Sequence, residues 1–354
     1  MKSYDLIIIG AGAAGLTAAI YASRYKLKVL VIGKLIGGTT GEAYMVCNFP
    51  SYGRISGTEL IQKIINQVRG LGVEIKPGEV YSINTKNKKN KEVFHLSKSQ
   101  KSGISVPQTQ EMFEAGRFED KKFFVSKTPG TQGVSDKNRN EFEVIISKEK
   151  YLSKKIIIAT GLTKNKLKIE REKELIGRGI NYCATCDAPL YKNKIVVVVG
   201  GSDSALTSAL LLAEFAKKIY ISYRKDKFIN AEPTWKEEVM KNKKISIMFN
   251  SEVKELIGKD FLEGIKIKRD SKIQELKIDG LFIEIGSTPN DFLAKELKLK
   301  MDGAYIKVDK KQKTSVSGVF AAGDITNNPL KQIVTACAEG AIAAYSAYKE
   351  ISAG

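Results

Sequence analysis

Cysteine, histidine and tryptophan are scarce in this chain of 354 residues, which has 4, 1 and 1 of them respectively. Four cysteines are too few for a disulfide framework in a chain of this length, which excludes a small secreted fold held together by disulfides. Long apolar runs are also missing. The longest are short segments such as Ile195–Val199, far below the roughly 18 residues that a membrane span requires. We therefore expect a globular protein that does not cross a bilayer, with the cytoplasm as its default location.

Acidic residues are outnumbered, with 39 Asp and Glu against 58 Lys and Arg and a net charge of +19. Such an excess would suit a nucleic-acid binder. However, the lysines are spread along the whole chain, and no helix-turn-helix, zinc finger or aromatic RNA-binding signature accompanies them. We therefore expect neither nucleic acid nor membrane as a partner. A solvated basic surface would also favour encounters with an acidic protein.

An internal repeat organises the chain, whose length predicts about two domains. Each copy reads as strand, glycine turn, helix and strand, which is the pattern of a dinucleotide-binding βαβ unit. The first copy comprises Asp5–Ile9, Gly10–Gly15, a helix to Tyr25 and Lys28–Ile32. The second comprises Lys194–Val199, Gly200–Ala205, Leu206–Phe215 and Lys218–Ser222.

The segment between the copies predicts a smaller sheet attached to the first unit, with strands in 73–83, 142–146 and 156–158. A stretch of about 86–140 is rich in Lys, Ser, Asn and Gln and predicts a long excursion. The only histidine, His95, lies in it and is expected to be a surface residue.

After the second copy we expect a strand at 281–286, a turn at 287–290, a strand at 318–323 and a small-residue helix from about Gln332 to Tyr348. This last block returns to complete the first domain. The prediction is an α/β protein with two Rossmann-like, three-layer ββα domains, the second inserted in the first. The expected boundaries are 1–161 with 288–354 for one domain and 162–287 for the other.

The first glycine turn has a physical reason at each position. Gly10 allows the tight turn, Gly12 lets the backbone approach a pyrophosphate, and Gly15 permits close helix packing. The acidic residue that often grips a ribose after the next strand is absent, since Gly33 and Lys34 stand there. Asp324 could accept a hydrogen bond from a ribityl hydroxyl, and its alternative interpretation is a helix N-cap.

Cys183 and Cys186 carry the predicted chemistry. Two thiols at this spacing can close a small disulfide ring, and Asp187 could relay a proton. A zinc site would need two more ligands, whereas Cys47 and Cys337 are unpaired and His95 is remote, so no metal is expected. We expect both of these other cysteines to be buried.

These motifs resemble the low-molecular-weight thioredoxin reductases, which are class II FAD-dependent pyridine nucleotide-disulfide oxidoreductases. The resemblance covers nearly the whole chain outside the 86–140 excursion. It rests on the glycine turns, Gly37–Gly38, Asn48–Pro50, Ala159–Gly161, Cys183–Asp187 and Gly318–Asp324 with Gln332. It implies a homodimeric flavoprotein that passes electrons from NADPH through FAD and the cysteine pair to thioredoxin or a thioredoxin-like protein.

The resemblance also implies residue roles. Cys186 would lie against the flavin, Cys183 would attack the substrate disulfide, and Asp187 would donate and accept protons. Hinges for rotation of the inserted domain would lie near 159–163 and 286–290. The implied flavin-binding residues are Gly10, Gly12, Ala13, Ala14, Gly15, Gly33, Gly38, Asn48, Ala159, Thr160, Gly161, Gly323, Asp324, Lys331, Gln332 and Ile333. The implied pyridine-nucleotide residues are Gly200, Gly201, Ser202, Asp203, Ser204, Arg224 and Lys225.

The nucleotide donor site departs from the family pattern. Ser202 stands where NADPH-dependent members have glycine, and Lys225 and Ile229 replace two arginines of the cluster that grips the 2′-phosphate. NADPH remains the expected donor, with reduced affinity. The alternatives are NADH or reduced ferredoxin, an acidic protein that would suit the basic surface. A further alternative is a flavoprotein that senses redox state or binds a partner without turnover.

Overall fold

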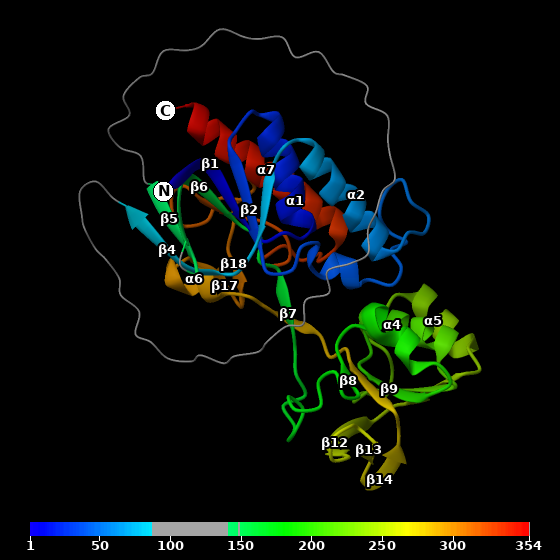
Figure 1. The fold of residues 1–354 in the computed structure, drawn as a ribbon. Helices are drawn as coiled ribbons and strands as arrows, with labels where there is room; N and C mark the ends of the chain where they lie inside the picture. Colours follow the sequence, from blue (N-terminus) through cyan, green and yellow to red (C-terminus); the bar gives the residue numbers. More distant parts are fainter. Residues whose placement is uncertain (87–140, 148, 354) are drawn as a thin grey trace.

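A computed structural model describes residues 1–86, 141–147 and 149–353, which form two α/β domains (Figure 1). The predicted excursion from residue 87 onward, with His95, lies outside the described residues. Within the described ranges, no helix is both long and apolar enough to span a membrane.

The first domain is built on one seven-stranded sheet, with the strand order β3-β2-β1-β6-β5-β4 and β19 added beside β6. The expectation of a separate smaller sheet is therefore wrong. The reason is β6, whose first half pairs antiparallel with β5 and whose apolar end pairs parallel with β1. The predicted 73–83 strand is also broken at Gly78, which has a φ of +159°. The strands are β1 (Lys2–Ile9), β2 (Val29–Gly33), β3 (Glu74–Pro77), β4 (Val80–Lys86), β5 (Glu141–Ile146), β6 (Glu149–Ile158) and β19 (Val319–Ala321).

Alternate residues of β1 enter two different cores. Leu6 and Ile8 pack under the helices, whereas Ile7 and Ile9 pack on the opposite face with residues of β4 and β5. This alternation follows from the two-residue period of a strand. The covering helices are α1 (Ala13–Arg24), α2 (Gly57–Gly70) and α7 (Ile333–Ser352), with η1 (Gly38–Glu42) beside them. The opposite face carries α6 (Phe292–Glu296), β17 (Met301–Asp302) and β18 (Tyr305–Ile306).

Helices α1 and α7 pack closely because their contact faces consist of small residues. A Cβ atom added to Gly340 of α7 would lie 2.1 Å from the carbonyl oxygen of Ala14. The predicted small-residue helix at 332–348 is thus confirmed, and it extends to Ser352.

The second domain repeats this design around a five-stranded parallel sheet of order β11-β10-β9-β15-β8. Val196 and Val198 of β9 pack against the helices, while Val197 and Val199 pack against a three-stranded antiparallel sheet. The domain therefore has three layers. The central strands are β8 (Ile180–Asn181), β9 (Ile195–Val199), β10 (Lys218–Ser222), β11 (Ile245–Met248) and β15 (Gly280–Ile283). One outer layer consists of the helices α4 (Asp203–Phe215) and α5 (Pro233–Lys241). The other consists of the strands β12 (Ser251–Ile257), β13 (Gly264–Arg269) and β14 (Lys272–Lys277). Two short helices, α3 (Ala184–Asp187) and η2 (Ala188–Tyr191), precede β9 in the chain.

The two crossings between the domains lie side by side. Strands β7 (Leu162–Lys164) and β16 (Ser287–Pro289) form an antiparallel ribbon. The Asn165 N–H donates to the Gly286 carbonyl and the Asn290 N–H to that of Gly161. The turn expected at 287–290 is therefore wrong, because this segment is paired along its length.

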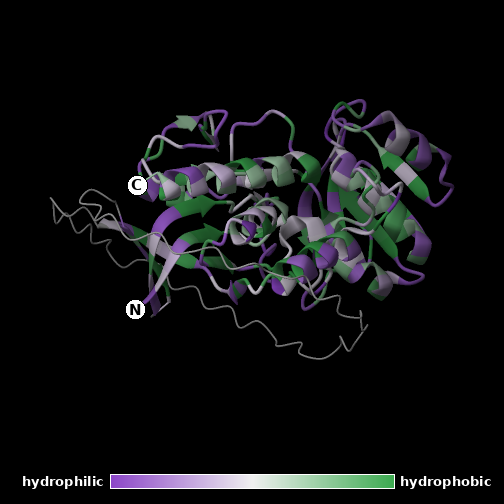
Figure 2. Cartoon of the chain, turned by 90° about the horizontal axis from the view of Figure 1, so that it is seen from above, coloured by the Kyte–Doolittle hydropathy of each residue, from purple (hydrophilic) through white to green (hydrophobic). Residues whose placement is uncertain are grey.

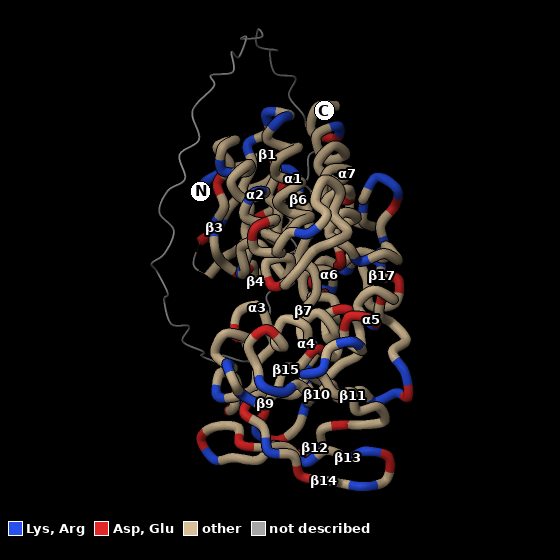
Figure 3. Tube along the Cα trace, turned by 90° about the vertical axis from the view of Figure 1, so that its right-hand side faces the viewer, with Lys and Arg blue, Asp and Glu red and all other residues tan. Residues whose placement is uncertain are grey.

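Polarity and charge follow this layering. The hydrophobic strands lie inside and the hydrophilic segments outside (Figure 2). Lys and Arg are distributed over both domains rather than gathered on one helix (Figure 3). The predicted fold class, two Rossmann-like domains, is confirmed.

Candidate active site

The first glycine turn lies where the strand order of the first sheet reverses. Parallel strands β2 and β6 flank β1, so the ends of β1 and β6 border the crevice in which such sheets bind ligands. Gly10 follows β1 with a φ of +119°, and a Cβ atom there would lie 2.0 Å from the Ala159 carbonyl oxygen. At Gly15 an added Cβ would lie 1.8 Å from the Gly10 oxygen. Only glycine fits at both positions.

The face of this turn is open at Gly12. The nearest heavy atom to a Cβ built there is the Gly38 Cα, at 3.8 Å. Gly12 is also the N-cap of α1 and provides no side-chain cap, so the first N–H groups of the helix remain available to an anion. The other predicted residues of this turn, Ala13 and Ala14, are buried in the first turn of α1. Gly33 is buried at the end of β2, against Ala11.

Three further predicted segments border the same crevice. Ala159 and Gly161 lie between β6 and β7, and the Thr160 hydroxyl donates to the Asn290 carbonyl at 3.2 Å. The Asn48 amide donates to the Gln332 side chain at 3.0 Å, which joins the 38–50 loop to the start of α7. Gln332 is the N-cap of α7, and Ile333 is its first residue.

Asp324 follows β19 and is partly buried. The alternative that it caps a helix is wrong, because Gln332 caps α7. No side chain within the described residues hydrogen-bonds its carboxylate. Burial raises its pKa, and the nearby Lys331 opposes that rise. Lys331 donates to the carbonyl of Thr326 and lies over the Tyr305 ring. An unpartnered carboxylate, an uncapped helix and an open glycine face together fit a dinucleotide whose ribose and pyrophosphate need a hydrogen-bond acceptor and N–H donors.

Glu339 is a site residue that the sequence analysis missed. It is 4% exposed, and one carboxylate oxygen accepts hydrogen bonds from the Gly323 N–H and the Thr326 hydroxyl, both at 2.8 Å. The other oxygen accepts from the Asn328 amide. Glu339 thereby holds the turn that carries Asp324. A signal was present in the sequence: a single acidic residue on the small-residue face of a helix.

The second glycine turn occupies the equivalent place in the second sheet. Gly200 follows β9 with a φ of +149°, and its Cβ would lie 2.2 Å from the Glu284 carbonyl oxygen at the end of β15. Ser202 is the N-cap of α4 without a side-chain cap. The residue that corresponds to Gly12 is Ser202, because each is the N-cap of the helix that follows its turn. Gly201 precedes it and packs against Tyr223, since a Cβ atom there would lie 2.5 Å from the Tyr223 ring.

The charged residues predicted at this second turn differ in exposure and in what they contact. Arg224 and Lys225 are exposed just after β10, next to Tyr223. Asp203 instead binds the Glu232 N–H at 2.6 Å. Ser204 lies in the first turn of α4. A dinucleotide at this turn would find a helix N-terminus, the side chain of Ser202 and two cations that have no ion-pair partner among the described residues.

The cysteine pair is a disulfide between Cys183 and Cys186, with Cα atoms 5.3 Å apart. Cys183 is the N-cap of the short helix α3, and Cys186 is exposed. Burial raises the pKa of Asp187, so this carboxyl keeps its proton to a higher pH than an ordinary aspartate. No group of three or more His, Cys, Asp or Glu side chains suited to a metal occurs in the described ranges.

Helix α3 packs against η1, the segment of the first domain that begins at Gly38. The hydroxyl of Thr185, between the two cysteines, donates to the Glu42 carbonyl at 2.6 Å. The disulfide of the second domain is thus tied to the loop beside the first glycine turn.

The remaining cysteines differ from each other. Cys337 is partly buried against the first core, as expected, and burial raises its pKa. Cys47 is exposed, so its expected burial is wrong. Its neighbour Val46 takes the place in the small core of that loop.

Comparisons with known proteins agree over the whole chain. The family model described as pyridine nucleotide-disulphide oxidoreductase matches residues 4–340. A thioredoxin reductase of Bacillus subtilis is 34% identical over 98% of this chain and 94% of its own length.

Two solved structures differ in how well they superpose. The thioredoxin reductase of Lactococcus lactis in its FR conformation has a TM-score of 0.80 at 29% identity, covering 99% of this chain and 100% of its own. That of Streptococcus pyogenes has a TM-score of 0.56 at 28% identity, covering 100% of this chain and 99% of its own. Although identity and coverage are nearly equal, this chain therefore superposes better on the L. lactis structure than on that of S. pyogenes.

We predict that Glu339→Ala leaves the Gly323 N–H buried without an acceptor, at a cost of about 1–3 kcal/mol, whereas the Thr326 hydroxyl keeps the Gly323 carbonyl as its acceptor. Urea unfolding should show the loss of stability, and the variant should retain less flavin on gel filtration. Glu339→Gln keeps one acceptor oxygen and should fall between. Equal stability of the Ala variant and the parent would contradict this role.

Proposed function

The chain belongs to the pyridine nucleotide-disulphide oxidoreductase family, and from this we propose that it is a flavin-dependent thioredoxin-disulfide reductase. Electrons would pass from NADPH through FAD and the Cys183–Cys186 pair to a thioredoxin-like protein. The observation that carries the proposal is the Cys183–Cys186 disulfide of the second domain held against the loop that borders the glycine turn of the first. The similar proteins of B. subtilis and L. lactis are both named thioredoxin reductase, and this supports the proposal.

We assign the flavin to the first domain, comprising 1–161 and 288–354, and the pyridine nucleotide to 162–287. The flavin would be held by the open glycine turn, the 37–38 loop, Asn48, the 159–161 segment and the 323–333 segment with Asp324. A bound flavin would supply the two electrons that open the disulfide. A reductase of protein disulfides works in a reducing compartment, which favours the cytoplasm.

The residues of the chain then perform thiol exchange. The Cys183 thiolate attacks a sulfur of the partner disulfide, forming a mixed disulfide and releasing one partner thiolate. The Cys186 thiolate then attacks the Cys183 sulfur, which restores the Cys183–Cys186 disulfide and releases the second partner thiolate. Asp187, whose pKa is raised by burial, donates protons to the leaving thiolates and accepts them from the cysteine thiols. Two electrons have left the pair, and the partner is a dithiol.

For the donor we propose NADPH, bound at the second glycine turn with its 2′-phosphate facing Arg224 and Lys225. Both cations are exposed and, among the described residues, neither has an ion-pair partner. The side chain of Ser202, at the N-cap of α4, opposes tight binding. NADH and an acidic iron–sulfur protein such as ferredoxin are the alternatives.

We also propose a homodimer through the outer face of α1 and α7. Val334, Ile342 and Tyr345 lie on one side of α7 and are 36%, 39% and 47% exposed, and Tyr21 of α1 is 42% exposed. Such a cluster of exposed apolar side chains is typical of a protein interface.

We predict that Cys183→Ser abolishes thioredoxin reduction, because no thiolate remains to attack the partner disulfide. Flavin bleaching by the electron donor should persist in this variant. Cys47→Ser, which removes an exposed thiol outside the pair, is the control and should keep the parent rate. Reduction of thioredoxin by the Cys183 variant at the parent rate would show that the attacking role is wrongly assigned.

The donor is decided by anaerobic titration of the bound flavin. We expect micromolar NADPH to bleach it, and Arg224→Ala to weaken the response by about tenfold or more, because a charge-assisted hydrogen bond contributes about 1.5–3 kcal/mol. Lys217→Ala, just before β10 at the edge of the sheet away from the glycine turn, should change nothing. Failure of both NADPH and NADH to bleach the flavin would reject a nucleotide donor and leave reduced ferredoxin.

The dimer is tested by sedimentation. Ile342→Glu should give a monomer, because it places a charge in the apolar face. Ile273→Glu changes an isoleucine that is 65% exposed on the second domain and should leave the dimer intact. A parent protein that sediments as a monomer rejects the interface.

A further inference from the structure

The redox segment is held at two points, before Cys183 and between the two cysteines, by Lys164 and Glu42. The Thr185 hydroxyl, between the cysteines, donates to the Glu42 carbonyl at 2.6 Å. The Lys164 ammonium donates to the carbonyl of Tyr182, the residue before Cys183. Lys164 also lies 3.2 Å from a carboxylate oxygen of Glu42. These three contacts hold the redox segment against Glu42 and Lys164.

Lys164 serves a second carboxylate as well. Its ammonium lies 3.4 Å from Glu284, which is 7% exposed and also accepts a hydrogen bond from the Ser208 hydroxyl at 3.2 Å. Burial raises the pKa of Glu284, and Lys164 opposes that rise. The Glu42 oxygen that faces Lys164 is buried and has no hydrogen-bond partner among the described residues. Without the ammonium, the buried Glu284 carboxylate and the buried oxygen of the partly exposed Glu42 would lose their counter-ion, which is unfavourable.

These residues belong to three different parts of the molecule. Glu42 ends η1 of the first domain, Lys164 ends β7 of the connecting ribbon, and Glu284 follows β15 of the second domain. Because Glu42 and Glu284 lie in different domains, a rotation that moves the second domain away from η1 has to break at least one of the two contacts of Lys164. The pairing therefore couples the orientation of the disulfide to the arrangement of the domains.

We propose that Lys164 and Glu42 are positioning residues for the Cys183–Cys186 disulfide, and that their ion pair holds the redox segment against the first domain in this arrangement. The inference rests on the proposed function, because it assigns the pair to one step of that cycle. It adds residues that neither touch the partner nor bind a nucleotide.

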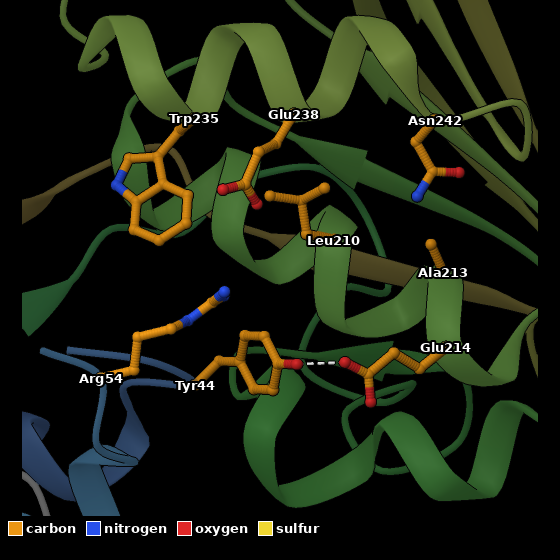
Figure 4. Close-up of a pocket in the computed structure, with 8 residues that line it drawn as sticks. All are labelled: Tyr44, Arg54, Leu210, Ala213, Glu214, Trp235, Glu238 and Asn242. Carbon is orange, nitrogen blue, oxygen red and sulfur yellow. Dashed lines mark hydrogen bonds between the residues drawn. The ribbon is translucent and has the colours of Figure 1, made fainter. Parts of the chain in front are cut away.

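The interface between the two domains contains a tryptophan whose fluorescence can report on their separation. A cavity of about 250 Å³ separates Tyr44 and Arg54 of the first domain from α4 and α5 of the second, and Trp235 lines it (Figure 4). Trp235 is the only tryptophan of the chain. Tyr44 donates a hydrogen bond across the interface to Glu214. Burial and this bond raise the pKa of Tyr44 to about 12, so its hydroxyl stays a donor at neutral pH. Trp235 is partly buried, and separation of the domains would increase its exposure to water.

The experiment compares Lys164→Met, Lys164→Arg and Glu42→Gln in the oxidised flavin-bound protein. Lys164→Met and Glu42→Gln should each move the Trp235 emission to longer wavelength, and Lys164→Arg, which keeps the charge, should restore the parent spectrum. The double variant Lys164→Met with Glu42→Gln should shift no further than either single variant, because both remove one interaction. Lys166→Met removes an exposed charge from the same segment and is the matched control.

Turnover supplies the second readout. Lys164→Met should lower kcat for thioredoxin several-fold without changing its KM, because Lys164 orients the disulfide and does not contact the partner. An unchanged Trp235 emission in Lys164→Met, or additive shifts in the double variant, would overturn the proposal. If Lys164→Met does not fold, Glu42→Gln and Lys164→Arg still give the emission comparison. A parent protein that does not reduce thioredoxin would reject the proposed function, while the emission cycle would still test the ion pair.

Discussion

Both sites of this protein depend on one steric constraint, the close passage of a strand end beside its parallel neighbour. Gly10 passes the Ala159 carbonyl and Gly200 passes the Glu284 carbonyl at distances that leave no room for a Cβ atom. In each sheet this approach brings the start of a helix to the place where the strand order reverses. Two crevices of the same kind arise in one chain, and the chemistry is arranged around them.

The two crevices are alike in backbone and different in side chains. At the first, the face of Gly12 is open, and Asp324 has no side-chain hydrogen-bond partner among the described residues. At the second, Ser202 takes the place of Gly12, and the Asp203 carboxylate accepts a hydrogen bond from a backbone N–H. The first is therefore the better nucleotide site on physical grounds, and the strength of binding at the second depends on the exposed cations after β10.

Much of this arrangement could be predicted from local patterns. Short runs of β-branched residues before a glycine turn predicted β1 and β9, and the small residues before Tyr348 predicted α7. The contacts that orient the disulfide could not be predicted, because Thr185 and Glu42 lie 143 residues apart and Glu42 belongs to no motif. The β16 strand was missed for a similar reason. Its three residues become a strand only because β7, far away in the sequence, lies beside them.

The β7–β16 ribbon brings the two ends of the second domain to one point on the first. The Asn165 N–H and the Gly286 carbonyl, which mark those ends, are joined by a hydrogen bond of 3.0 Å. The chain therefore leaves the first domain and returns to it at neighbouring points, which a link of a few residues would be enough to join. Insertion of the second domain therefore interrupts the first domain at one point only, between neighbouring residues, and leaves every strand of its seven-stranded sheet intact.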